Sequence, residues 1–256
     1  MDIYCNNDAG YIELGNRLNG VFAYNNISAL SFFQEEKYIN LWIALESTMT
    51  TGQYTNIISH IKEVLPSIMA KKYIYRIIRN FSEDCIRCDI DFHILPSPID
   101  LKKDNKQDLV SELICALNNT DTFTIIESLC ASNILLEFRL GEIKDFILDI
   151  QKTIQKIARY HETITWHVQR LYRIRNEITH SAWRQEESIV VYIEHLFDYL
   201  AILISEIVYT ATEKDMTNIE DILPYLKDNY DAMIALSKEN NPIIQGILTT
   251  GIIEVI

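Results

Sequence analysis

Residues 164–182 read ITWHVQRLYRIRNEITHSA, and this stretch decides the fold class. At about 100° per residue, its apolar side chains fall on one stripe of a helix. The stripe consists of Ile164, Val168, Leu171, Ile174, Ile178 and Ala182. Arg173, Asn176 and His180 fall together on the opposite face. The pattern predicts a helix with one face in a core, the other open to solvent or a partner, and Arg175 at the edge of the apolar stripe.

Long stretches without glycine or proline extend the helical pattern over most of the chain. The 82 residues between Gly141 and Pro224 contain neither, nor do the 42 residues between Pro98 and Gly141. Such stretches are typical of helices. We expect helices over about 34–50, 55–87, 107–118, 121–148, 150–182, 186–212 and 218–238. Residues 1–30 contain three glycines and several asparagines. We therefore predict an all-α fold, with a short irregular or hairpin flank over residues 1–30 and one helical bundle domain over residues 31–256.

The charge of the chain is unevenly distributed. The formal net charge is -13, and an acidic protein is a poor general binder of nucleic acid. Residues 151–184 nevertheless carry a charge of +5, because they contain seven Lys and Arg residues against two Glu residues. They also contain three of the six histidines. This segment favours an anionic partner, although a basic helix paired with acidic neighbours fits the charge equally well.

The sequence predicts neither a membrane segment nor a metal site. No apolar run reaches the roughly 18 residues that a membrane span needs, and the N-terminus does not resemble a signal peptide. The five cysteines are an odd number, which is typical of reduced thiols in the cytoplasm. Cys85 and Cys88 form a single C-x-x-C without the second ligand pair of a zinc site. We expect a cytoplasmic protein without a metal or other cofactor.

The polar face of the 164–182 helix suits phosphodiester chemistry. An imidazole such as that of His180 can carry a proton to or from a ribose hydroxyl. An arginine guanidinium can stabilise the negative charge of a phosphorus-centred transition state, and the Asn176 amide can orient either group. This chemistry requires no metal.

The same residues resemble a known family. Arg175-Asn176-Glu-Ile-Thr-His180 is similar to the signature of HEPN ribonucleases, and its surroundings resemble ApeA-like HEPN domains of bacterial anti-phage defence. Residues 41–46 (LWIALE) resemble the first helix of that branch. The resemblance implies a metal-independent endoribonuclease that cuts single-stranded RNA as a toxin or defence effector. It assigns proton transfer to His180, phosphate stabilisation to Arg175 and orientation to Asn176.

The resemblance also implies a composite site in a homodimer. The face of the motif helix would meet its symmetry mate, and Trp183 is our candidate for an apolar contact there. We expect Arg170, Arg173 and Arg184 to bind RNA. We also expect an antitoxin or sensor protein as a partner of such an effector. We also predict that Glu46, on a helix that is apolar nearly all round, pairs with Arg175 or Arg173 and positions it, because burying an unpaired carboxylate is costly.

Two other interpretations stay open. A HEPN-type module without catalytic activity would bind RNA, a nucleotide or a protein partner through the same face. A plain helical interaction protein would contain the motif by accident. His180 would then only cap the C-terminus of its helix, where a cation is favoured. An isolated glutamate facing solvent is the alternative for Glu46.

Overall fold

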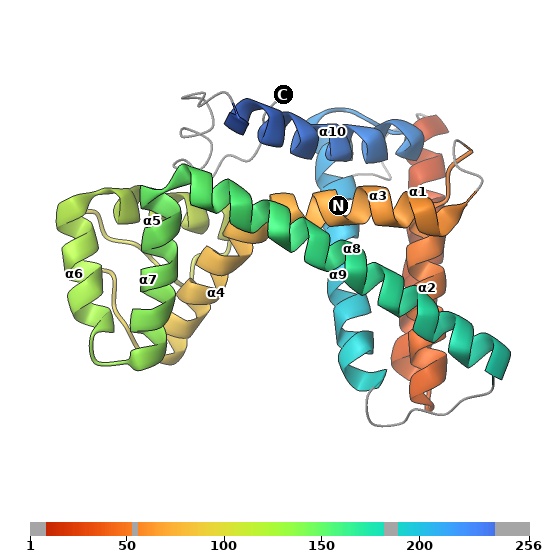
Figure 1. The fold of residues 1–256 in the computed structure, drawn as a ribbon, viewed down its shortest axis with the longest axis horizontal. Helices are drawn as coiled ribbons and strands as arrows, with labels where there is room; N and C mark the ends of the chain where they lie inside the picture. Colours follow the sequence, from red (N-terminus) through yellow and green to blue (C-terminus); the bar gives the residue numbers. More distant parts are fainter. Residues whose placement is uncertain (1–8, 53–55, 182–188, 239–256) are drawn as a thin grey trace. The chain divides into compact units, whose positions relative to one another are not determined.

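The computed structural model describes residues 9–52, 56–181 and 189–238 of the chain. Within these residues it contains ten α-helices and no strand, so the predicted all-α fold is confirmed. None of the described helices is long and apolar enough to cross a membrane. Figure 1 labels the helices along the chain. They are α1 (Ala9–Leu30), α2 (Gln34–Met49), α3 (Ile57–Lys71), α4 (Tyr73–Arg87), α5 (Lys106–Asn118), α6 (Thr120–Cys130), α7 (Ile134–Leu148), α8 (Ile150–Ser181), α9 (Ile189–Glu213) and α10 (Ile219–Lys238).

The N-terminal segment is a helix, and the predicted irregular or hairpin flank over residues 1–30 is wrong for its described part. Helix α1 begins at Ala9 and packs against α2. The Tyr11 hydroxyl donates a hydrogen bond to the Ala211 carbonyl at 3.2 Å. Burial of one stripe of α1 outweighs the low helix propensity of its glycines. The stripe consists of Tyr11, Leu14, Leu18 and Val21.

Two predicted helices are each divided into two. The expected helix over residues 55–87 is α3 and α4, with the break at Lys72. The expected helix over residues 121–148 is α6 and α7. Asn133 is the N-cap of α7, where its side-chain oxygen accepts hydrogen bonds from the backbone N–H groups of Leu135 and Leu136. Such a cap satisfies N–H groups that have no partner within the helix.

The chain forms two compact units rather than the single domain predicted over residues 31–256. Unit 1 comprises Met1–Met69 and His161–Asp228, and unit 2 comprises Ala70–Tyr160 and Asn229–Ile256. Each boundary falls inside a helix, namely α3, α8 or α10. Because a continuous helix joins the units at each point, no glycine- or proline-rich linker marks the division in the sequence.

Unit 1 contains the motif helix and the α2 helix. Helix α2 packs against both α1 and α9. The fully buried Tyr38 of α2 donates a hydrogen bond to the Leu171 carbonyl of α8 at 2.6 Å. Trp42, one turn further along α2, is fully buried, and its ring centroid lies 5.9 Å from that of Tyr172. These contacts fix α2 alongside the centre of the motif segment.

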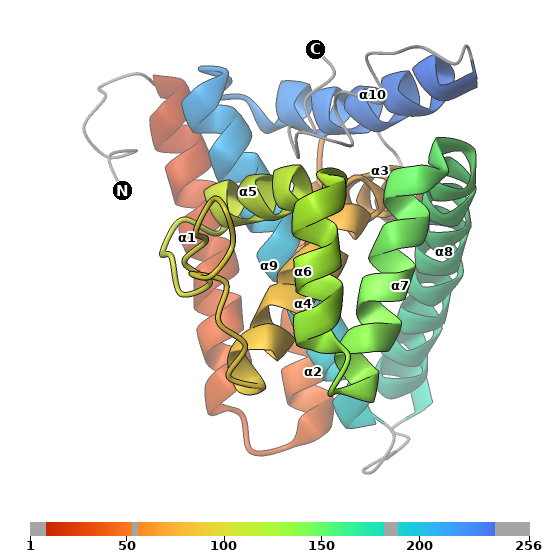
Figure 2. The ribbon, with the colours of Figure 1, turned by 90° about the vertical axis from the view of Figure 1, so that its left-hand side faces the viewer.

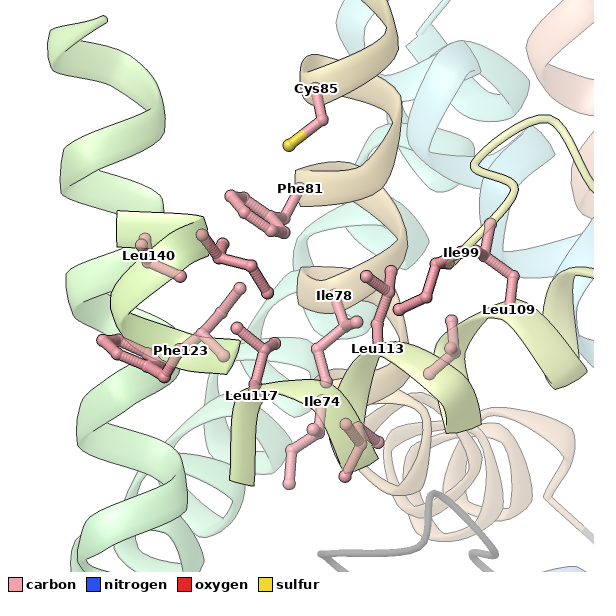
Figure 3. Packing of buried hydrophobic residues seen from close by; sticks show 14 of the residues in the cluster. Ile74, Ile78, Phe81, Cys85, Ile99, Leu109, Leu113, Leu117, Phe123 and Leu140 are labelled. Atoms are coloured by element: carbon pink, nitrogen blue, oxygen red, sulfur yellow. The ribbon is translucent and has the colours of Figure 1, made fainter. Parts of the chain in front are cut away.

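Unit 2 is built around α4, α5, α6 and α7, which Figure 2 shows from a second side. Its core is a cluster of buried apolar residues, and Figure 3 shows Phe81, Leu113, Leu117 and Phe123 among them. A buried carboxylate also joins two helices of the unit. Asp84 of α4 forms an ion pair with Arg139 of α7.

Candidate functional site

Helix α8 presents two different faces within unit 1. Ile164, Val168 and Leu171 are almost completely buried on one side. Arg170 and Arg173 are exposed on the other. The amphipathic pattern read from the sequence is therefore present in the structure, and the apolar stripe orients the polar face.

Arg175 lies where the two faces meet. Its side chain is 30% exposed, and its Nη2 atom lies 4.0 Å from the Glu46 Oε2 atom of α2, which is 21% exposed. Its Nη1 atom donates a hydrogen bond to the Asn176 side-chain oxygen at 3.2 Å. The contact expected from the sequence joins Glu46 to Arg175 and not to Arg173. At 4.0 Å it is an ion pair rather than a hydrogen bond, so Glu46 attracts the guanidinium and restricts its orientation less strictly than a hydrogen bond would.

His180 lies in the last turn of α8, and its side chain is exposed. It has no hydrogen bond or ion pair with another described residue. The five residues from Arg175 to His180 correspond to about 7.5 Å along the helix and about 140° around it. Arg175 therefore extends toward α2, whereas His180 projects from a different side of α8.

The arginines expected to bind RNA differ in their surroundings. The Arg170 guanidinium lies over the ring of Tyr192 on α9, 5.1 Å from its centroid. Arg173 is exposed. Neither arginine forms an ion pair with a residue of the described part of the chain. Arg184, and the Trp183 proposed as an interface residue, lie outside the described residues.

A cluster of histidines and tyrosines beside Arg170 was not identified from the sequence. The His167 Nδ1 atom lies 2.7 Å from the Tyr199 hydroxyl, and the ring centroids of His167 and His195 are 4.7 Å apart. Burial, together with the nearby His195 and Arg170, lowers the pKa of His167 to about 4. His167 is therefore neutral near pH 7. The signal for the cluster is the spacing of Tyr192, His195 and Tyr199 at i, i+3 and i+7 on α9, which places them on one helix face.

The cysteine pair singled out in the sequence belongs to the core of unit 2. Cys85 is completely buried, and its hydrogen bond to Cys130 and its burial raise the pKa of its thiol. A thiol in this state is a poor nucleophile. Cys88 accepts a hydrogen bond from the Asn133 side-chain nitrogen at 3.1 Å. Among the described residues, no group of three or more His, Cys, Asp or Glu side chains is placed to hold a metal ion.

An apolar groove of about 560 Å³ lies between α1 and α9 of unit 1. Phe22 and Asn25 line it from α1, and α9 contributes mainly apolar or small side chains. The α9 residues are Phe197, Leu200, Ala201, Ile204, Ser205, Val208, Tyr209 and Thr212. The groove contains no carboxylate, imidazole or cationic side chain, so it is not equipped for proton transfer or for binding phosphate.

Comparison of the chain with family models, curated proteins and solved structures finds no match. The geometry of α8 and the resemblance of its motif are therefore the features from which a function can be inferred.

Proposed function

We propose that this chain is a metal-independent endoribonuclease that cleaves single-stranded RNA. The observation that supports this best is the environment of Arg175. Its guanidinium lies between the Glu46 carboxylate and the Asn176 amide, on the same helix as the exposed His180. A positioned arginine and an accessible imidazole are the two groups that metal-free RNA cleavage needs. A role as a toxin or anti-phage effector follows from the resemblance to ApeA-like domains alone.

The proposed reaction is an internal transfer at phosphorus. His180 removes the proton of the ribose 2′-hydroxyl, and the 2′-oxygen attacks the neighbouring phosphorus. Arg175 stabilises the additional negative charge on the phosphate oxygens, and the 5′-oxygen leaves and takes up a proton from water. The products are a 2′,3′-cyclic phosphate and a free 5′-hydroxyl. Asn176 orients the guanidinium through its side-chain oxygen.

A homodimer with a composite site is part of this proposal. One chain places Arg175 and His180 on different sides of α8, so a second copy is needed to bring an imidazole and a guanidinium to one phosphate. A two-fold interface repeats every contact and supplies both groups twice. An antitoxin or sensor protein that blocks this face would keep the enzyme inactive.

The placement of Arg175 and His180 on different sides of α8 also favours a second candidate function. If no second copy completes the site, the polar face of α8 is a non-catalytic surface that binds RNA, a nucleotide or a protein partner. In that case Glu46 only offsets the charge of a half-buried arginine.

Purified protein incubated with single-stranded RNA in EDTA distinguishes the two functions. The enzyme should leave cyclic phosphate ends, and its His180→Ala variant should be inactive. A protein that binds RNA in this assay but leaves it intact would support the non-catalytic function.

A further inference from the structure

Trp166 is an exposed tryptophan on the same side of α8 as Arg170, Arg173 and His180. Its side chain is 76% exposed. It has no ring contact or hydrogen bond with another residue of the described part of the chain. A tryptophan exposed to this extent presents a large apolar surface that a ligand can cover.

The other aromatic residues of this segment have structural contacts instead. The Tyr160 hydroxyl accepts a hydrogen bond from Arg76 at 2.7 Å, and its ring lies against that of Tyr73. Tyr172 lies against the buried Trp42. Within the described part of α8, Trp166 is therefore the aromatic side chain available to a ligand.

The spacing along α8 places cations between Trp166 and His180. From Trp166, Arg170 is about 6 Å along the axis, Arg173 about 10.5 Å and His180 about 21 Å. All four positions lie within about 80° of one another around the helix. The Arg170 guanidinium contacts the Tyr192 ring and has no hydrogen bond or ion pair with another described residue, so its N–H groups are available to phosphate oxygens.

Acidic side chains interrupt this surface but leave more positive than negative charge between Trp166 and His180. Glu162 is exposed one turn before Trp166, where it would repel a phosphate. Between Trp166 and His180, this side of α8 contains Arg170 and Arg173 against Glu177, because Arg175 extends toward α2. A cationic strip that ends at an exposed aromatic ring fits a single strand, whose phosphates contact arginines while an unpaired base stacks on the ring.

We propose that Trp166 is a base-stacking subsite for single-stranded RNA, and that Arg170 and Arg173 guide the strand from Trp166 to His180. This inference deepens the proposed function and rests on it for the cleaved bond. The distance of about 21 Å corresponds to roughly six stacked nucleotides at 3.4 Å each, and to fewer in an extended strand. The subsite therefore contacts a base several nucleotides from the cleaved phosphate, and a very short RNA does not reach it.

The test measures binding in a His180→Ala background, so that the RNA stays intact. Fluorescence anisotropy gives the affinity for labelled single-stranded RNAs of about twelve and about three nucleotides. Trp166→Ala should weaken binding of the longer RNA between about fivefold and about 150-fold, which is the range for loss of one stacked base. It should leave binding of the shorter RNA unchanged. Trp166→Phe should retain part of the affinity, because a phenyl ring also stacks.

Phe138→Ala is the matched control, because Phe138 is a 66% exposed aromatic residue of α7 in unit 2. It should not change either affinity. Equal binding of the longer RNA by Trp166→Ala and its parent would overturn the subsite, as would equal losses for both RNA lengths. Trp166 would then be better explained as a contact for a protein. A parent that binds no RNA also overturns the proposal.

Cleavage by the chain with His180 intact is scored separately. Binding that depends on Trp166 without cleavage would reject the nuclease function and retain the subsite. Cleavage that is unaffected by Trp166→Ala, with unchanged affinity for the longer RNA, would reject the subsite and retain the function.

Discussion

Replacing Glu46 by glutamine tests whether the carboxylate on α2 positions Arg175. Glutamine retains the size of the side chain and one acceptor oxygen, and it removes the charge. Two unit charges at the observed 4.0 Å attract each other by about 4 kcal/mol at an effective dielectric constant of about 20. The side chains are 30% and 21% exposed, so solvent screening and the cost of desolvation reduce the net value to about 1 kcal/mol.

We expect Glu46→Gln to lower the free energy of unfolding by about 1 kcal/mol and the cleavage rate by roughly tenfold. The rate falls because a guanidinium held by Asn176 alone samples more orientations. Urea unfolding measures the first quantity, and kcat/KM on a single-stranded RNA measures the second.

The matched control is Glu36→Gln, the same change at an exposed position in the first turn of α2. Glu36 forms no ion pair with another described residue, so its variant should cleave at the unaltered rate. An undiminished kcat/KM in Glu46→Gln would refute the positioning role. Equal losses in both variants would also refute it, because they would reflect the overall charge of α2.

Three further predictions concern acid stability, helix capping and salt. His167 has a folded pKa of about 4, below the ordinary value of about 6.5, so the unfolded chain binds this proton more tightly. The free energy of unfolding should therefore fall by about 2 kcal/mol as the pH drops from about 6.5 to 4. Urea titrations should show a smaller fall for His167→Gln. Identical pH profiles for the two proteins would contradict this prediction. Asn133→Ala removes the N-cap of α7 and should cost about 1 kcal/mol in thermal unfolding, whereas an unchanged midpoint would argue against the cap. Arg173→Ala should reduce the slope of log affinity for single-stranded RNA against log salt by about 0.7, and an unaltered slope would mean that Arg173 contacts no phosphate.

Helices were predictable where apolar residues recur clearly at helical spacing. Helix α2 was expected over about 34–50 and runs from Gln34 to Met49, and α8 was expected over about 150–182 and runs from Ile150 to Ser181. Helix α1 was missed because its glycines and asparagines lower local propensity, whereas burial of its apolar stripe is a tertiary effect. The break before α7 was missed because it contains no glycine or proline. Only Asn133, the N-cap of α7, marks it in the sequence.

One contact of the candidate site was predictable from the sequence, whereas the orientation of its side chains was not. The apolar surroundings of Glu46 indicated a buried partner, and the structure places Arg175 there. The orientation of Arg175 away from His180 depends on the packing of α2 against α8, which one sequence does not specify. The division into two units was not predictable either, since its boundaries lie inside continuous helices.

The most direct test of the proposed ribonuclease compares the unsubstituted protein with its His180→Ala variant on one single-stranded RNA in EDTA. His180 is exposed, so the variant should fold normally, and circular dichroism with thermal unfolding checks this. We predict that the unsubstituted protein leaves 2′,3′-cyclic phosphate ends and that His180→Ala loses about 10²–10⁴ in rate. Equal cleavage by the two proteins, or cleavage that EDTA abolishes, would contradict the account.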